Sequence, residues 1–235
     1  MSGGRSVGRA CHPRRVTATA DDYLWFFDRF PALGEAYCLT LVSGLGPGDV
    51  VERLGATSDE LVARCAEWLD DVPHGMSLDD LGEAAMAGPG EYGMWDGHFF
   101  GAAALGDWCL IVEPNDSMGV DAAIAGPLSE GRRLVSHFRN VNAVKRFHWM
   151  EDGELRLRFE PPFAATRHGA DPDGAVEAMR LAGFDLEGEP GCFTVDDVRR
   201  HTGAVFALAE NLTGVRLTPE LLAGSAYLGA VAPRP

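Results

Sequence analysis

The sequence predicts an α+β fold in which one antiparallel sheet of about five strands packs against N- and C-terminal helices. Near both ends of the chain, apolar residues recur at the three- and four-residue spacing of a helix face. From His98 onward the spacing changes to the alternation of a half-buried strand. The chain has 235 residues, 46% of them apolar, which is enough for one hydrophobic core.

Helix starts are indicated by capping boxes, in which a hydroxyl residue is followed three positions later by an acidic one. Such pairs occur at Thr19/Asp22, Thr57/Glu60, Ser77/Asp80 and Thr194/Asp197. The first pair precedes one short helix with an aromatic stripe, which we expect to be core rather than a ligand platform: Tyr23, Phe26, Phe27 and Phe30. Other helices are expected over residues 49–54 and 120–130, with a C-cap at Gly214 and a restart at Thr218-Pro219.

Five segments with alternating apolar residues are expected to form a meander. They cover residues 98–104, 108–113, 133–141, 143–150 and 154–160. Residues 36–42 are apolar throughout and could form a helix or a buried strand; we favour the strand.

The hairpin around Asp152-Gly153 decides which side chains share a face, and two loop lengths are open. A two-residue loop would mix apolar and basic side chains on both faces. A three-residue loop sets Trp149 opposite Leu155 and Phe147 opposite Leu157, so that one face is apolar. We therefore predict the longer loop, with a glycine bulge.

The same register predicts a basic stripe on the other face of the sheet. Its members are Arg146, His148, Arg156 and Arg158, with Arg139 expected on the next strand. Like charges opposite one another destabilise a sheet unless something lies between them. The compensator is solvent, a neighbouring acid such as Glu154 or Glu160, or, as a hypothesis, an anionic ligand or an acidic partner segment.

A second, looser polar group is a candidate for proton transfer or binding. It comprises Glu113, Asp116, His137, Asn140 and Asn142. The competing interpretation is an ordinary strand exit, in which proline ends the ladder and Asn or Asp makes local turn hydrogen bonds. No nucleophile elbow, phosphate loop or zinc-protease motif occurs, so we assign no catalytic residue, metal or cofactor, and whether the chain is an enzyme stays open.

Charge limits the classes of partner. Thirty-five acidic residues face twenty basic ones, giving a net charge of −15, and this disfavours nucleic acids. No apolar run approaches the roughly 20 residues of a membrane span. Five cysteines without metal spacing are expected to be reduced thiols in the cytoplasm.

Arginines are concentrated at the start of the chain, without an apolar stretch that would make a secretory signal. We expect residues 1–18 to be a disordered tail, the alternatives being a transit peptide or an overextended start, and residues 19–230 to form a single α+β domain.

Several stretches resemble an uncharacterised actinomycete protein family. They are residues 41–55 (LVSGLGPGDVVERLG), 110–116 (LIVEPND), 140–147 (NVNAVKRF), 153–161 (GELRLRFEP) and 209–222 (AENLTGVRLTPELL). The family has no assigned activity, so the resemblance implies a bacterial cytoplasmic setting and no catalytic residues.

The sequence leaves two functions open. The first is a non-catalytic binding or interaction protein, immunity-like or regulatory, whose acidic surface meets a basic protein partner. The alternative is an enzyme or small-molecule binder that uses the polar face of the sheet. A concave pocket joining the polar groups would favour the second function, whereas a flat face would favour the first. The oligomeric state is not predicted.

Overall fold

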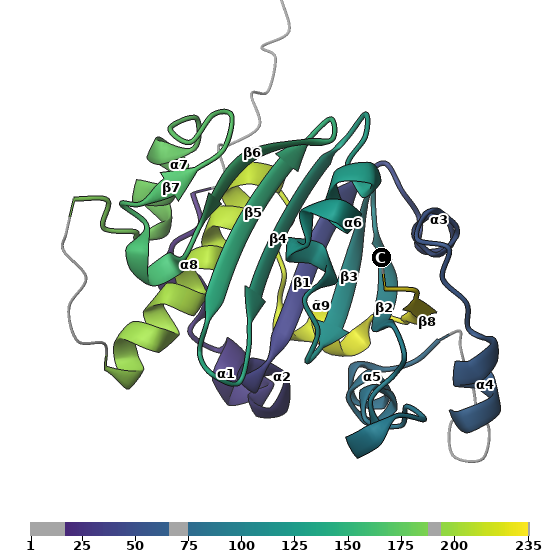
Figure 1. Ribbon diagram of the computed structural model, residues 1–235. Coiled ribbons are helices and arrows are strands. Elements are labelled where there is room, and N and C mark those ends of the chain that lie inside the picture. Colours follow the sequence, from purple (N-terminus) through teal and green to yellow (C-terminus); the bar gives the residue numbers. More distant parts are fainter. Residues whose placement is uncertain (1–16, 66–74, 188–193, 235) are drawn as a thin grey trace, which may run out of the picture.

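The computed structural model describes residues 17–65, 75–187 and 194–234. Within them lies one antiparallel sheet of eight strands in the order β7-β6-β5-β4-β1-β3-β2-β8 (Figure 1). The strands are β1 (Tyr37–Ser43), β2 (His98–Leu105), β3 (Trp108–Pro114), β4 (Arg133–Arg139), β5 (Lys145–Glu151), β6 (Glu154–Phe159), β7 (Arg167–His168) and β8 (Leu228–Ala232). The predicted α+β class with an antiparallel sheet is confirmed.

The predicted meander of about five strands is wrong because β1 lies in the middle of the sheet. It pairs with β3 on one side and with β4 on the other, so both of its faces and both of its edges are covered. This explains why residues 37–42 are all buried and show no alternation. The structure also adds β8 beside β2 and the two-residue strand β7 beside β6.

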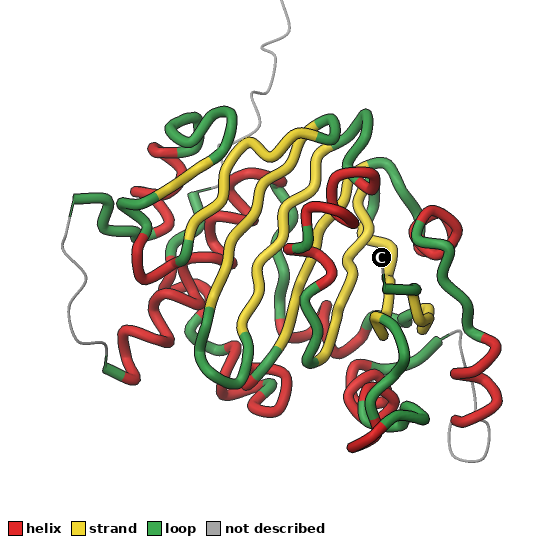
Figure 2. Tube along the Cα trace, in the orientation of Figure 1, coloured by secondary structure: helices red, strands yellow, loops and turns green. Residues whose placement is uncertain are grey.

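The described helices lie on both sides of the sheet and at its ends (Figure 2). The α-helices are α1 (Phe26–Arg29), α2 (Pro31–Glu35), α3 (Pro47–Arg53), α4 (Asp59–Cys65), α5 (Leu78–Ala85), α6 (Ala122–Leu128), α7 (Val176–Ala182), α8 (Val195–Thr213) and α9 (Pro219–Gly224). Short 3-10 helices are η1 (Ala20–Tyr23), η2 (Glu91–Gly93), η3 (Met118–Val120) and η4 (Pro161–Phe163). The aromatic stripe spans η1 and α1 instead of one helix, and Tyr23 and Phe26 are buried in the core as expected.

The helix boundaries follow the predicted chemistry at several ends. Ser77 and Thr194 accept hydrogen bonds from the amides of Asp80 and Asp197, three residues on, which satisfies amides that a helix start leaves open. Gly214 ends α8 with a φ of 76°, a left-handed conformation that costs glycine little. The tail at residues 1–16, with Cys11, and residues 188–193, with Cys192, lie outside the described part of the chain.

The two faces of the sheet are covered differently. On one face, which we call the helical face, Leu39, Phe147 and Leu157 pack into the larger core with α8. On the other, which we call the pocket face, Val42, Phe100 and neighbouring apolar side chains pack beneath α3, η3 and α6. In Figure 1, α6 lies in front of the sheet and α8 behind it.

The hairpin between β5 and β6 has a two-residue loop, so the predicted three-residue loop is wrong. Asp152 and Gly153 form the loop, with φ values of 54° and 76°, and Glu151 lies opposite Glu154. The extra residue is a β-bulge at Arg156, since Trp149 pairs with Leu157 but Met150 pairs with Leu155. The extra residue thus lies in the strand and not in the loop. Leu157 and Phe159 still share the apolar face with Phe147 and Trp149, whereas Leu155 points to the pocket face.

Candidate functional site

An open cavity of about 760 Å³ lies over β5, β6 and β7 on the pocket face. One wall comes from residues 117–122, which contain η3 and the start of α6, and the other comes from η4 and the segment that leads into β7. The residues that line it are Ser117, Val120, Asp121, Ala122, Arg146, His148, Leu155, Arg158, Phe159, Glu160, Phe163, Thr166 and His168. The cavity exists because η3 and α6 cover this face over the central strands and leave β5–β7 open.

Basic side chains form a row across the floor of the cavity. His148 on β5 lies directly opposite Arg158 on β6, and Arg158 lies opposite His168 on β7. Arg146 precedes His148 by two residues and therefore points to the same side of the sheet. In this register Arg146, His148 and Arg158 lie on one face of the sheet, as predicted.

The two arginines of the cavity have no acidic partner in the described structure. Arg146 and Arg158 are exposed, and neither guanidinium makes a hydrogen bond or an ion pair to any described residue. Two acids also line the cavity. The Asp121 carboxylate accepts a hydrogen bond from the amide of Ala123 at 2.9 Å, and Glu160 forms no ion pair with either arginine among the described residues.

His148 lies beneath this charge and is 6% exposed. Burial, with the positive charges of Arg146 and Arg158, lowers the pKa of His148 to about 4. The ring is therefore neutral at pH 7. Its Nδ1 atom is enclosed without a hydrogen-bond partner in the described part of the chain, which is an unusual state for a buried polar atom.

Arg156 and Arg139, the other predicted members of the stripe, lie elsewhere. The bulge takes Arg156 out of the row, and its guanidinium pairs with Glu154 and Asp171 at 3.1 Å each. Arg139 lies over the ring of Phe27 at 5.4 Å on the helical side and donates to the carbonyl of Glu35 at 2.8 Å. Both arginines hold chain segments together.

Glu113 anchors the wall of the cavity. Its two carboxyl oxygens accept hydrogen bonds from the amides of Met118 (2.6 Å) and Gly119 (3.0 Å), which ties η3 to the end of β3. The carboxyl is fully buried, and burial, together with the nearby Asp116, raises the pKa of Glu113 to about 8.

A small buried polar cluster lies under the same wall. The hydroxyls of Thr40 and Ser136 are 2.9 Å apart, and Cys38 Sγ is 3.3 Å from Ser136 Oγ. Gly119 covers this cluster so closely that a Cβ atom would overlap the Thr40 hydroxyl. Close backbone approach thus requires glycine in η3.

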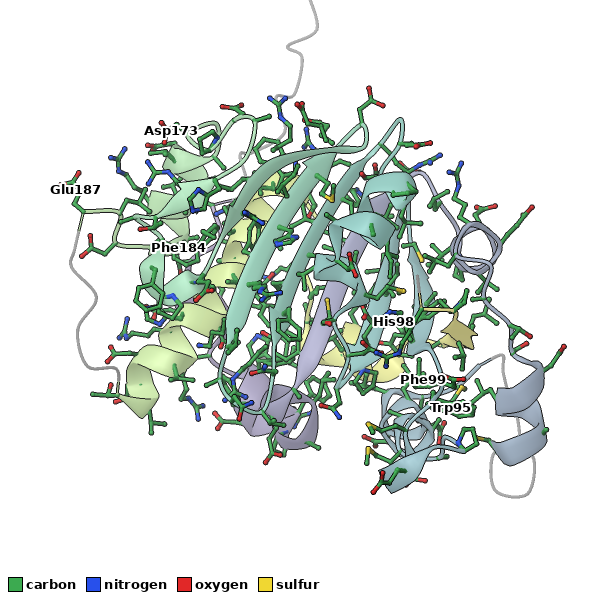
Figure 3. The ribbon with its side chains drawn as sticks, viewed as in Figure 1. Trp95, His98, Phe99, Asp173, Phe184 and Glu187 are labelled. Carbon is green, nitrogen blue, oxygen red and sulfur yellow. The ribbon has the colours of Figure 1, made fainter. Side chains whose placement is uncertain are left out.

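The remaining residues of the second predicted group are separated. Asp116 pairs with His98 Nδ1 at 2.9 Å, at the start of β2 where Figure 3 shows His98 near Trp95 and Phe99. Asn140 Oδ1 accepts from the amides of Asn142 and Val144 and closes the turn after β4.

Of that group, Asp116 and Asn140 line a second cavity of about 240 Å³, whose lining does not include Glu113, His137 or Asn142.

His137 lies on the helical face, away from both cavities. Its ring is 2% exposed and packs against Phe206 and Tyr37, with ring centroids 4.5 and 5.5 Å away. Burial lowers the pKa of His137 to about 3. The structure thus places His137 in the core, and it does not bring His137 to Glu113 or to the basic row.

Sequence reasoning missed the walls of the cavity. His168 lies in a strand of two residues, too short for an alternation to be seen, and Leu155 reaches the cavity only through the bulge at Arg156. In the described ranges, no three His, Cys, Asp or Glu side chains are grouped as metal ligands would be. No helix within those ranges has the length and apolar character needed to span a bilayer.

Fold and cavity together define an α+β protein with a basic pocket on one face of an antiparallel sheet. The profile of a family of unknown function, DUF6461, matches residues 16–235. The chain belongs to this family, and the uncharacterised family expected from the sequence is confirmed to that extent. No curated protein and no solved structure matches the chain.

Proposed function

We propose that this protein binds a small organic anion in the cavity over β5, β6 and β7. The observation that carries the proposal is the pair of arginines, Arg146 and Arg158, that line a concave site with no acidic partner in the described structure. Like charges held close on a sheet are stabilised when an anion lies between them, and guanidinium groups bind carboxylate or phosphate through two parallel hydrogen bonds.

The shape of the site favours a small molecule over a protein surface. Pockets for small ligands have volumes of roughly 300–1,000 Å³, and the volume here, about 760 Å³, falls in that range. The enclosed His148 and the hydroxyl-bearing Ser117 and Thr166 supply further polar groups at the lining.

The test is calorimetric titration of the full chain with inorganic phosphate and with sulfate at low ionic strength. We expect binding of both ions, and a loss of about tenfold or more in affinity for Arg158→Gln or Arg146→Gln, since a hydrogen bond to a charged group contributes about 1.5–3 kcal/mol. Arg156→Gln is the matched control, because Arg156 lies on the same strand but outside the cavity lining. No heat of binding to either ion, or equal losses in all three variants, would overturn the proposal.

A protein partner is the second candidate, supported by the net charge of −15. An acidic surface speeds association with a basic protein and makes the complex sensitive to salt. The role would be regulatory or immunity-like, in the bacterial cytoplasm that the actinomycete resemblance implies. The buried thiols of Cys38 and Cys109 fit this reducing compartment. Failure to recover a salt-sensitive complex at low ionic strength would count against this second function.

A further inference from the structure

The cavity floor changes from charged to apolar along the strands. At one end Arg146 and Glu160 line it, in the middle His148 faces Arg158, and at the far end Leu155 lies opposite the buried Met150. The four steps along the strand from Arg146 to Met150 cover about 13 Å, at roughly 3.3 Å per residue. That length is several times the width of one oxyanion.

The walls near the apolar end are apolar as well. Val120 and Ala122 contribute to the wall formed by η3 and the start of α6. Phe163 also lines the cavity, but at the opposite end, because η4 directly follows Glu160. Apolar side chains beside a basic site are not needed to hold an ion such as phosphate. They stabilise a ligand whose own apolar surface leaves water on binding.

We infer that the ligand is an amphipathic organic anion, whose phosphate or carboxylate group lies at Arg146 and Arg158 and whose apolar body extends toward Leu155, beside Val120 and Ala122. The inference rests on the proposed function, anion binding, and adds that the ligand also has an apolar body. The β-bulge at Arg156 is what creates the apolar half, since without it the side chain of Leu155 would point to the helical face.

Charge and size separate this ligand from simpler ones. An inorganic ion contacts only the basic row and leaves the apolar end in water. A neutral apolar molecule would cover the two guanidinium groups without pairing them, which is unfavourable. Only a molecule with both parts matches both ends of the cavity.

The experiment compares matched probes on the full chain: inorganic phosphate against 1-naphthyl phosphate, and acetate against 1-naphthoate. We expect each aromatic probe to bind at least about tenfold more tightly than its small counterpart, because about 1.4 kcal/mol corresponds to tenfold and burial of an aromatic ring exceeds it. The pair with the higher affinity identifies the head group as phosphate or carboxylate.

Two variants locate the apolar body. Leu155→Ser and Ala122→Gln should each reduce the gain in affinity of the aromatic probe and leave the affinity for the small ion unchanged. Ala122 is exposed, so that this variant tests the idea even if Leu155→Ser impairs folding. Arg158→Gln should lower the affinity for both probes of a pair by the same factor, so that the ratio of the two affinities is unchanged.

The outcomes separate the two proposals. If the small and the aromatic probe bind equally, or if neither the Leu155 nor the Ala122 variant changes the ratio of their affinities, the amphipathic ligand is excluded while anion binding stands. If no probe binds, or if binding does not depend on Arg158, anion binding itself fails.

Discussion

His148 lies directly opposite Arg158 on the neighbouring strand, with both side chains on the pocket face of the sheet. Their charges are therefore coupled, and a bound anion should reverse the effect of the arginines on the histidine. We predict that sulfate raises the pKa of His148 from its value of about 4 in the free protein, because a nearby anion favours the charged ring. NMR titration of the His148 ring with and without sulfate measures the shift.

The same coupling predicts tighter sulfate binding as pH falls from about 6 toward 4, since a proton on His148 then accompanies the ion. Sulfate keeps its charge over this range, so the ion itself adds no pH dependence. His148→Gln should remove this pH dependence. An unchanged His148 titration in saturating sulfate would mean that the ion binds elsewhere.

Glu113 should make the protein less stable as pH rises. The carboxyl has a pKa of about 8 in the folded protein, above its ordinary value, so that the folded state holds a proton that the unfolded chain releases. Its contribution to stability is full below pH 4.5 and is lost as pH rises through about 8. Urea unfolding of wild type and Glu113→Gln at several pH values measures it.

Glu113→Gln should flatten this part of the pH profile and also cost about 1–3 kcal/mol at pH 5. The reason for the cost is that one amide of η3 then faces an NH₂ group and loses its acceptor. Parallel profiles for the two proteins between pH 5 and 8 would contradict the role given to Glu113.

Gly119→Ala should destabilise the protein by about 1–3 kcal/mol, because the added methyl group overlaps the Thr40 hydroxyl in a packed cluster. Gly82→Ala is the matched control: Gly82 lies inside α5 with open space around it, so the same substitution should stabilise the helix by about 0.5–1 kcal/mol. Thermal or urea unfolding of both variants compares them, and equal effects would show that η3 is not tightly seated on the sheet.

His137→Leu should leave stability at pH 7 unchanged or raise it by about 1 kcal/mol. The leucine removes a buried Nδ1 atom that has no hydrogen-bond partner among the described residues. The pKa of His137 is lowered to about 3 in the folded protein, so that wild type should lose stability as pH falls from 6.5 through 3 and the variant should lose less. Acid unfolding curves of the two proteins measure this difference. A large loss of stability in the variant at pH 7 would instead show that His137 makes a stabilising polar interaction.

Much of the sheet could be predicted because its longer strands are runs rich in apolar residues that are bounded by turns, and in β6 these residues alternate with exposed ones. The alternation of Phe147, Trp149, Leu157 and Phe159 with basic residues is a local pattern, and it was enough to place Arg146, His148 and Arg158 on one side. Loop length and bulge position could not be told apart, since both add one residue and both keep the apolar side chains together. The central position of β1 depends on pairing with segments far away in the sequence, and local sequence patterns do not predict such pairing.

The candidate site was predictable only where it lies on regular strands. The walls consist of η3, the start of α6, η4 and β7, whose positions follow from tertiary contacts such as the hydrogen bonds of Glu113 to the amides of η3. His137 was assigned to the polar group because of its residue type, but its register with Leu39 and Phe147 places it in the core.

The central place of β1 also determines how the chain can fold. A ribosome releases Tyr37–Ser43 long before both neighbours of this strand exist, and β8, which completes the far edge beside β2, emerges last. Folding must therefore wait for pairings between residues far apart in the chain, and proteins dominated by such pairings fold in milliseconds to seconds rather than microseconds. Until the second half has been synthesised, an unpaired apolar strand is open to other chains, and this is where chaperone contact would matter most.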